Sequence, residues 1–263
     1  MNNSIKYKNT SVNYTDEGKG KVLVLLHGFL ESLEIWNDFS NELSKDFRVI
    51  TIDLLGHGKT GDIDKIHTME MMAEAVKFVL DTLKIDKCTM VGHSMGGSVT
   101  LAFAEMFPEQ LNGFGLFHST AYDDSPEVKI NRNRMIEAVN NNHIGFINSF
   151  IPNLFPPETV NNFTDKIINL QRLAGSMHKD SINAAINGMK LRRNRLDVIS
   201  NSKVPVLFII GKKDSRQPFE KVLPQIAASN NSTVIILGNV GHMGHIESPK
   251  ETIYAIKTFT NKL

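Results

Sequence analysis

The feature that most constrains this chain is the run at residues 90–97, Met-Val-Gly-His-Ser-Met-Gly-Gly. An apolar stretch of strand length leads into the run, and an amphipathic helical pattern that stops at Pro108 follows it. A serine at a sharp turn from strand to helix is typical of a nucleophile elbow, in which glycines let the backbone and the helix approach closely. We therefore predict that the hydroxyl of Ser94 projects into a cavity.

Length and composition limit the class of protein. A chain of 263 residues with 41% hydrophobic content is long enough for one sizeable domain with an insertion. The formal charge of +1 gives no electrostatic reason to expect binding to nucleic acid or to an anionic membrane. The N-terminus lacks the apolar core of a signal peptide and no segment is long enough to cross a bilayer, which predicts a cytoplasmic protein. The oligomeric state, monomer or homodimer, stays open.

Two smaller features receive structural interpretations. The basic cluster Lys190, Arg192, Arg193 and Arg195 is short and local, so we interpret it as a solvated helix end. The single cysteine, Cys88, lies in a strand pattern, so we interpret it as a small core residue.

Six apolar runs of strand length alternate with helical patterns. Each run is nearly continuous, which is typical of parallel strands that are buried on both faces. The sequence therefore predicts an α/β fold, with a mostly parallel central sheet, helices on both faces, and an antiparallel hairpin at residues 5–14 that leads into the sheet. The expected strands are residues 22–26, 47–52, 88–91, 114–117, 204–210 and 233–237, and the expected helices are residues 33–43, 68–83, 95–107, 219–228 and 249–259.

The alternation of strands and helices stops between residues 119 and 203. Helical patterns rich in Asn, Met and Phe continue there without a strand, and several prolines divide them. We therefore predict an all-helical lid inserted after the sixth strand, with the core formed by residues 1–118 and 204–263. Most apolar side chains of the insertion are expected to form its own core, and a minority to face a substrate.

A serine hydroxyl needs a base within hydrogen-bond reach, and the base needs a carboxylate that holds it in the correct tautomer. Asp214 follows the strand at 204–210, and His242 follows the next strand. Because loops after parallel strands open on the same edge of a sheet, these residues are expected to converge. The predicted roles are Ser94 as nucleophile, His242 as base and Asp214 as the acid that orients the base.

Other residues compete for these roles. His245 is an alternative base, and we favour His242 because a glycine precedes it and fits a close approach. Asp123 and Asp124 also follow a strand, and we favour Asp214 because its strand is longer and nearer to the histidine loop. A lone His-x-x-His pair without Cys or Glu at ligand spacing makes zinc improbable, and neither a dinucleotide fingerprint nor a P-loop is present. We expect no metal and no cofactor.

Negative charge that develops on a substrate carbonyl needs preorganised donors, which backbone amides supply. One donor is expected to be the amide of Met95, at the start of its helix, and the other the amide of Phe29, in the loop after residues 22–26. The residues expected to line the substrate pocket are Leu30, His93, Phe146 and Phe150.

Together these motifs resemble the α/β-hydrolase fold superfamily, in its lidded, esterase-like branch. The likeness covers almost the whole chain, through the motifs at residues 27–29, 53–58, 92–97, 211–214, 241–242 and 247–249. It implies a helical lid in the insertion and a triad of Ser94, Asp214 and His242. Relatives with dehalogenase or epoxide-opening chemistry carry Asp at the elbow, so the serine argues against both.

The expected function is that of a cofactor-independent serine hydrolase, which cleaves a small-molecule carboxylic ester of small to medium acyl chain through an acyl-enzyme. Carbon–carbon bond hydrolases share the Ser-Met-Gly-Gly elbow and remain an alternative. Lyases of the menaquinone pathway share the His-Gly-Phe-Leu opening and Trp36, although they typically carry Arg where this chain has Ser98. A small-ligand receptor with an intact triad is an alternative from another class. The sequence does not separate ester cleavage from carbon–carbon cleavage, because both need the same site.

Overall fold

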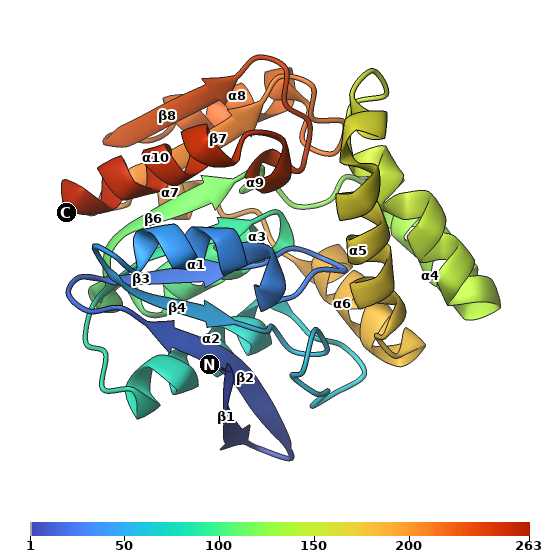
Figure 1. Cartoon of the computed structure of the whole chain (residues 1–263), viewed down its shortest axis with the longest axis horizontal. Helices are drawn as coiled ribbons and strands as arrows, with labels where there is room; N and C mark the ends of the chain where they lie inside the picture. Colours follow the sequence, from blue (N-terminus) through green and yellow to red (C-terminus); the bar gives the residue numbers. More distant parts are fainter. Residues whose placement is uncertain (1) are drawn as a thin grey trace.

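A twisted sheet runs through the centre of the protein (Figure 1) in the computed structural model, which describes residues 2–263. Its eight strands in the described chain are ordered β1-β2-β4-β3-β5-β6-β7-β8. β1 and β2 form the predicted hairpin, β2 pairs antiparallel with β4, and all other neighbours are parallel. The strands are β1 (Asn2–Tyr7), β2 (Thr10–Glu17), β3 (Val22–Leu26), β4 (Arg48–Ile52), β5 (Cys88–His93), β6 (Leu111–Phe117), β7 (Val206–Gly211) and β8 (Ser232–Leu237).

Helices cover both faces of the sheet, which confirms the predicted fold class. Successive side chains of a strand point to opposite faces, so in β3 Leu23 and Leu25 pack with α1 and α10, whereas Val24 and Leu26 pack in the cluster that contains α2 and α3. Continuous apolar strands are therefore explained by burial on both sides. The helices of the core are α1 (Asn37–Leu43), α2 (Met69–Thr82), α3 (Met95–Met106), α8 (Phe219–Ala227), α9 (Gly244–Glu247) and α10 (Pro249–Asn261), with short 3₁₀ turns at Leu33–Trp36 and Pro108–Gln110.

The segment between β6 and β7 contains helices and no strand in the described chain. Figure 1 shows α4, α5 and α6 side by side at one end of the sheet. α4 changes direction at Asn142, whose φ of −159° is not helical, and the side chain of Asn142 accepts the N–H of Gly145 at 2.9 Å where the helix resumes. The elements of this insertion are α4 (Pro126–Phe150), α5 (Thr164–Gly175), α6 (Lys179–Leu191) and α7 (Leu196–Ser200), with 3₁₀ turns at Pro152–Leu154 and Val160–Phe163.

Two further observations concern the chain as a whole. Cys88 is fully buried in β5, as a core residue. No helix among residues 2–263 combines the length and the apolar character that a membrane crossing requires.

Candidate active site

The turn between β5 and α3 is held in a conformation that few side chains adopt. Ser94 has φ 50° and ψ −113°, and the helix begins at the next residue, Met95. Such a conformation costs about 1–3 kcal/mol and persists only where the surroundings impose it. A Cβ on Gly92 would lie 2.1 Å from the carbonyl oxygen of Gly96, and a Cβ on Gly96 would lie within 2.6 Å of backbone atoms at the end of β3. Only glycine therefore fits at either position beside Ser94.

Three loops at the carboxyl edge of the sheet bring the predicted triad residues together. His242 Nε2 lies 2.8 Å from Ser94 Oγ, and His242 Nδ1 lies 2.9 and 3.0 Å from the two carboxylate oxygens of Asp214. The side chains of His242 and Asp214 are buried, whereas Ser94 is partly exposed. This arrangement allows a proton to pass from the hydroxyl to an imidazole whose other nitrogen is held by a carboxylate.

Asp214 is held as a carboxylate by its surroundings. Burial alone would raise the pKa of Asp214, but the charge of His242 and hydrogen bonds from neighbouring groups outweigh burial and hold the pKa well below its usual range. Its Oδ1 also accepts the backbone N–H groups of Arg216 and Gln217, at 2.8 and 2.9 Å. His118, which no sequence motif indicated, lies 3.4 Å from Oδ2, and burial lowers the pKa of His118 to about 4.

The competing residues lie elsewhere. Asp124 is buried and forms ion pairs with Arg132 and Arg192, and Asp123 is exposed. His245 is buried, and neither of its ring nitrogens has a hydrogen-bond partner in the described chain. Hydrogen bonds therefore connect Ser94 to His242 and His242 to Asp214. None of the three competing residues takes part in this series.

Phe29 and Met95 carry the backbone amides that the sequence predicts as oxyanion donors. Both residues line the same cavity as Ser94. Within residues 2–263, no hydrogen bond joins either backbone N–H to a protein acceptor. Unpaired backbone N–H groups that line such a cavity can donate hydrogen bonds to a substrate oxyanion and stabilise its negative charge.

A buried ion pair connects the loop of Phe29 to the loop of His242. Glu31 Oε2 lies 2.9 Å from His93 Nδ1 and also accepts the N–H of Gly28, and His93 Nε2 donates to the carbonyl oxygen of His242 at 2.8 Å. Because both ring nitrogens of His93 face acceptors, the imidazole is protonated. Burial alone would raise the pKa of Glu31, but His93 outweighs it and lowers that pKa to about 2. Burial alone would lower the pKa of His93, but Glu31 raises it.

The same pair belongs to a group of possible metal ligands. Donor atoms of Glu31, His93 and His245 lie within 4.8 Å of one another, and all three residues are buried. A metal at this point would have to displace the proton that His93 shares with Glu31, and the pKa shifts of both groups oppose that displacement. Holding protein segments together is the role that these contacts support.

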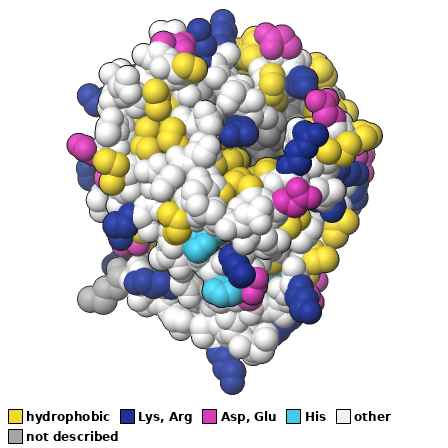
Figure 2. Space-filling view, turned by 90° about the vertical axis from the view of Figure 1, so that its right-hand side faces the viewer, with side chains coloured by type: hydrophobic (Ala, Val, Ile, Leu, Met, Phe, Trp, Pro, Cys, Tyr) yellow, Lys and Arg dark blue, Asp and Glu magenta, His cyan; other side chains and the backbone are white. Residues whose placement is uncertain are grey.

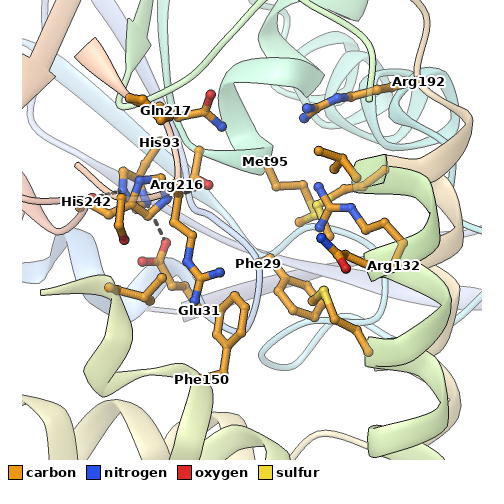
Figure 3. Close-up of a pocket in the computed structure, with 18 of the residues that line it drawn as sticks. Phe29, Glu31, His93, Met95, Arg132, Phe150, Arg192, Arg216, Gln217 and His242 are labelled. Carbon is orange, nitrogen blue, oxygen red and sulfur yellow. Dashed lines mark hydrogen bonds and ion pairs between the residues drawn. The ribbon is translucent and has the colours of Figure 1, made fainter. Parts of the chain in front are cut away.

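The cavity above Ser94 has a volume of about 340 Å³ and lies between the sheet and the insertion (Figure 3). Of the predicted pocket residues, His93 and Phe150 line it. Leu30 and Phe146 are not among its lining residues: Leu30 is buried with a φ of 62°, and Phe146 packs behind Phe150, with ring centroids 5.4 Å apart. Other lining residues come from α4, the 3₁₀ turn at Pro152–Leu154, α6 and the segment before α8, and include Val128, Met135, Leu154, Met189, Ser215 and Gln217.

Cationic side chains also line the cavity, a property that the sequence analysis missed. They are Arg132, Arg192, Arg216 and Lys221. The interpretation of residues 190–195 as a solvated helix end is wrong for two of its arginines. Arg192 is partly buried and paired with Asp124, and Arg195 is buried with ion pairs to Glu70 and Glu105. The basic cluster was visible in the sequence, but its burial depends on how the insertion packs. Figure 2 shows this side of the molecule, with a hollow that holds apolar side chains and has Lys or Arg side chains beside it.

Comparisons with known proteins agree with this geometry. Residues 21–249 match the model of a family described as alpha/beta hydrolase fold. A solved thermophilic esterase from Thermogutta terrifontis, with malate bound, is 30% identical, with a TM-score of 0.93 over 100% of this chain and 98% of that chain.

Curated relatives are more distant and more varied. A dihydrolipoyllysine-residue acetyltransferase component of an acetoin cleaving system from Pseudomonas putida is 27% identical over 92% of this chain. The chain spans 64% of the length of that relative, which is less than two thirds. A putative 2-succinyl-6-hydroxy-2,4-cyclohexadiene-1-carboxylate synthase from Bacillus subtilis is 27% identical over 89% of each chain.

Proposed function

Because the chain belongs to the α/β-hydrolase fold family, we propose that it is a serine hydrolase that cleaves a carboxylic ester of small to medium acyl chain. The observation that carries the proposal is the hydrogen-bonded series from Ser94 Oγ through His242 to Asp214, with contacts of 2.8 and 2.9 Å. No cofactor takes part in the proposed reaction, because a serine, a base and an acid suffice for acyl transfer.

The proposed reaction has two steps. In the first step, Ser94 Oγ attacks the ester carbonyl while His242 Nε2 takes the proton of the hydroxyl. The same imidazole then protonates the departing alcohol. In the second, His242 removes a proton from water as the water attacks the acyl-enzyme. The bond between the acyl carbon and Ser94 Oγ then breaks, the imidazolium returns the proton to Oγ, and the acid is released. Asp214 stabilises the imidazolium in both steps, and the N–H groups of Phe29 and Met95 bind the oxyanion.

The cavity supports the proposed size of the substrate. A volume of about 340 Å³ is at the small end of the usual range for ligand pockets, about 300–1,000 Å³. Phe29 and Phe150 both line the cavity and pack edge to face against each other, with ring centroids 5.8 Å apart, which provides an apolar surface for a short chain.

Substitution of the nucleophile tests the proposal. Ser94→Ala is expected to lower kcat on a chromogenic short-chain ester by a factor on the order of 10³ or more, because triad members act as a unit. Ser232→Ala, on the exposed start of β8, is the matched control and should leave kcat unchanged. Undiminished hydrolysis by the Ser94 variant would refute the proposal.

Counting turnovers separates the enzyme from a triad-bearing receptor. An enzyme should release many equivalents of product per protein molecule, whereas a receptor should stop near one equivalent. A parallel assay with a vinylogous diketone acid tests the carbon–carbon hydrolase, which would cleave that substrate faster than the ester.

A further inference from the structure

We propose that Arg132 and Arg192 bind a carboxylate of the substrate, so that the ester cleaved at Ser94 carries a negatively charged acid group. The inference rests on the proposed function, because it names the class of ester that the same cavity accepts.

The two arginines come from different parts of the insertion and meet at one carboxylate. Arg132 lies on α4 and its Nε donates to Asp124 Oδ2 at 2.9 Å, while Arg192, just after α6, donates from Nη2 to Asp124 Oδ1 at 2.7 Å. Both arginines line the cavity, whereas Asp124 does not. The side chains of Arg192 and Asp124 are 10% and 1% exposed. Asp124 therefore holds the two guanidinium groups in place at the cavity lining.

Both guanidinium groups have hydrogen-bonding capacity that the protein does not use. Arg192 donates from Nη1 to Ser98 Oγ at 3.2 Å, but its Nε is buried without a partner in the described chain. Arg132 uses Nε for Asp124, and its terminal nitrogens make no hydrogen bond within residues 2–263. Buried donors are normally satisfied, and a planar guanidinium matches a carboxylate through two parallel hydrogen bonds. Figure 3 shows both arginines across the cavity from His242, where a group at the far end of a substrate would lie.

The balance of charge indicates an anionic ligand. Asp124 neutralises one of the two guanidinium groups, so the cluster keeps a net charge of +1. Arg216, which lies over the ring of Phe150 at 4.5 Å, and Lys221 add positive charge to the cavity lining. The one acidic residue that lines the cavity in the described chain is Glu31, and its charge is balanced by His93. A carboxylate meets part of this surplus, and its planar shape matches the planar guanidinium groups of the cluster.

Two esters that differ by one negative charge and one methyl group test the subsite. 4-Nitrophenyl hydrogen adipate carries a free carboxylate, and its methyl ester is the neutral counterpart with the same leaving group. The wild-type protein should hydrolyse the anion with kcat/KM at least about tenfold above that of the neutral ester, because hydrogen bonds to charged groups are strong. Arg132→Gln should lower this ratio about tenfold, and so should the double variant Asp124→Asn with Arg192→Gln, which removes a buried pair together rather than leaving one charge alone.

Arg134→Gln is the matched control. Arg134 lies on the same helix, is exposed and bonds to Asn131 of its own helix, so its loss should leave the ratio unchanged. Equal hydrolysis of the two esters by the wild-type protein would overturn the inference, and so would a ratio that survives in both cavity variants. The wild-type comparison needs no variant and stands even where a variant does not fold.

A binding measurement separates failure of the subsite from failure of the proposed function. If the wild-type protein cleaves neither ester, the proposed hydrolase is refuted, and calorimetric titration with adipate then decides the subsite. Adipate binding that weakens about tenfold in Arg132→Gln supports the subsite. Absence of binding to the wild-type protein, or equal binding to both proteins, refutes it.

Discussion

Glu31 and His93 form a buried ion pair, with 2.9 Å between Oε2 and Nδ1, that links the two loops on either side of the nucleophile. Glu31 accepts the N–H of Gly28, beside Phe29, and His93 donates to the carbonyl oxygen of His242. The backbone N–H of His242 donates in turn to Leu154 of the insertion at 3.0 Å. The position of the imidazole is therefore set by contacts with both the elbow and the insertion.

Glu31→Gln should weaken catalysis without removing a group that touches the substrate. The loss of the carboxylate charge leaves the imidazolium of His93 without its partner, which is expected to lower the free energy of unfolding by about 3–5 kcal/mol. A displacement of the His242 loop by ~1 Å would lower kcat by a factor on the order of 10 to 100. Steady-state kinetics at a temperature where the variant is folded measures the effect. Glu34→Gln, on the exposed side of the same loop, is the control, and an unchanged kcat in the Glu31 variant would exclude a positioning role.

The two neighbouring histidines should respond in opposite ways. His242→Ala is expected to lower kcat by a factor on the order of 10³ or more. His245→Leu should keep activity within a few-fold and raise the free energy of unfolding by about 1 kcal/mol, because it removes a buried polar group whose nitrogens have no partner. Kinetics and denaturant unfolding of both variants check this assignment, which an inactive His245 variant with an active His242 variant would reverse.

Asp214→Asn should lower kcat by a factor on the order of 10³ to 10⁴ while the fold is kept, since an amide no longer holds His242 in the required tautomer. Asp123→Asn removes an exposed carboxylate near the same edge of the sheet and should change kcat by less than about twofold, because exposed substitutions have small effects. Parallel measurement of kcat for the two variants decides between the competing acids. Near-normal activity of the Asp214 variant would contradict the proposed triad.

Stability is expected to fall as the pH decreases from 6.5 toward 5. Burial lowers the pKa of His118 to about 4 and the pKa values of His57 and His245 to about 3, so in this range the unfolded chain binds protons that the folded chain excludes. Below its unfolded pKa, each such histidine lowers the free energy of unfolding by about 1.4 kcal/mol for each pH unit of acidification. His93 acts in the opposite sense: its raised pKa adds stability that is present below pH 6.5 and is lost as the pH rises through its folded value.

Burial also lowers the pKa values of His27 and His67. Five histidines with lowered pKa values outweigh the one with a raised pKa, so the sum is acid destabilisation. Denaturant unfolding at pH 6.5, 5.8 and 5.0 measures the slope. His245→Leu should reduce that slope by about 1.4 kcal/mol per pH unit, the share of one histidine. A slope that is the same in the wild-type protein and the variant would contradict the buried, neutral state of His245.

Local patterns predicted much of this molecule. The continuous apolar strands and the alternating helices led to the correct fold class, because burial on both faces leaves a mark on every residue of a strand. Element ends shifted by a few residues: the strand expected at 204–210 is Val206–Gly211, and the strand expected at 114–117 begins at Leu111. Strand ends depend on pairing with neighbours, which a local pattern does not contain.

The sequence by itself determined which residues follow the strands, and therefore placed Ser94, Asp214 and His242 at one edge of a parallel sheet, since the chain direction of such a sheet fixes where its loops emerge. Only the tertiary structure decided the lining of the cavity. It paired Arg192 with Asp124, left Leu30 and Phe146 out of the lining, and joined Glu31 to His93 across 62 residues. These outcomes depend on how the helices of the insertion pack against the sheet, and contacts between residues far apart in the chain leave no periodic signal in the sequence.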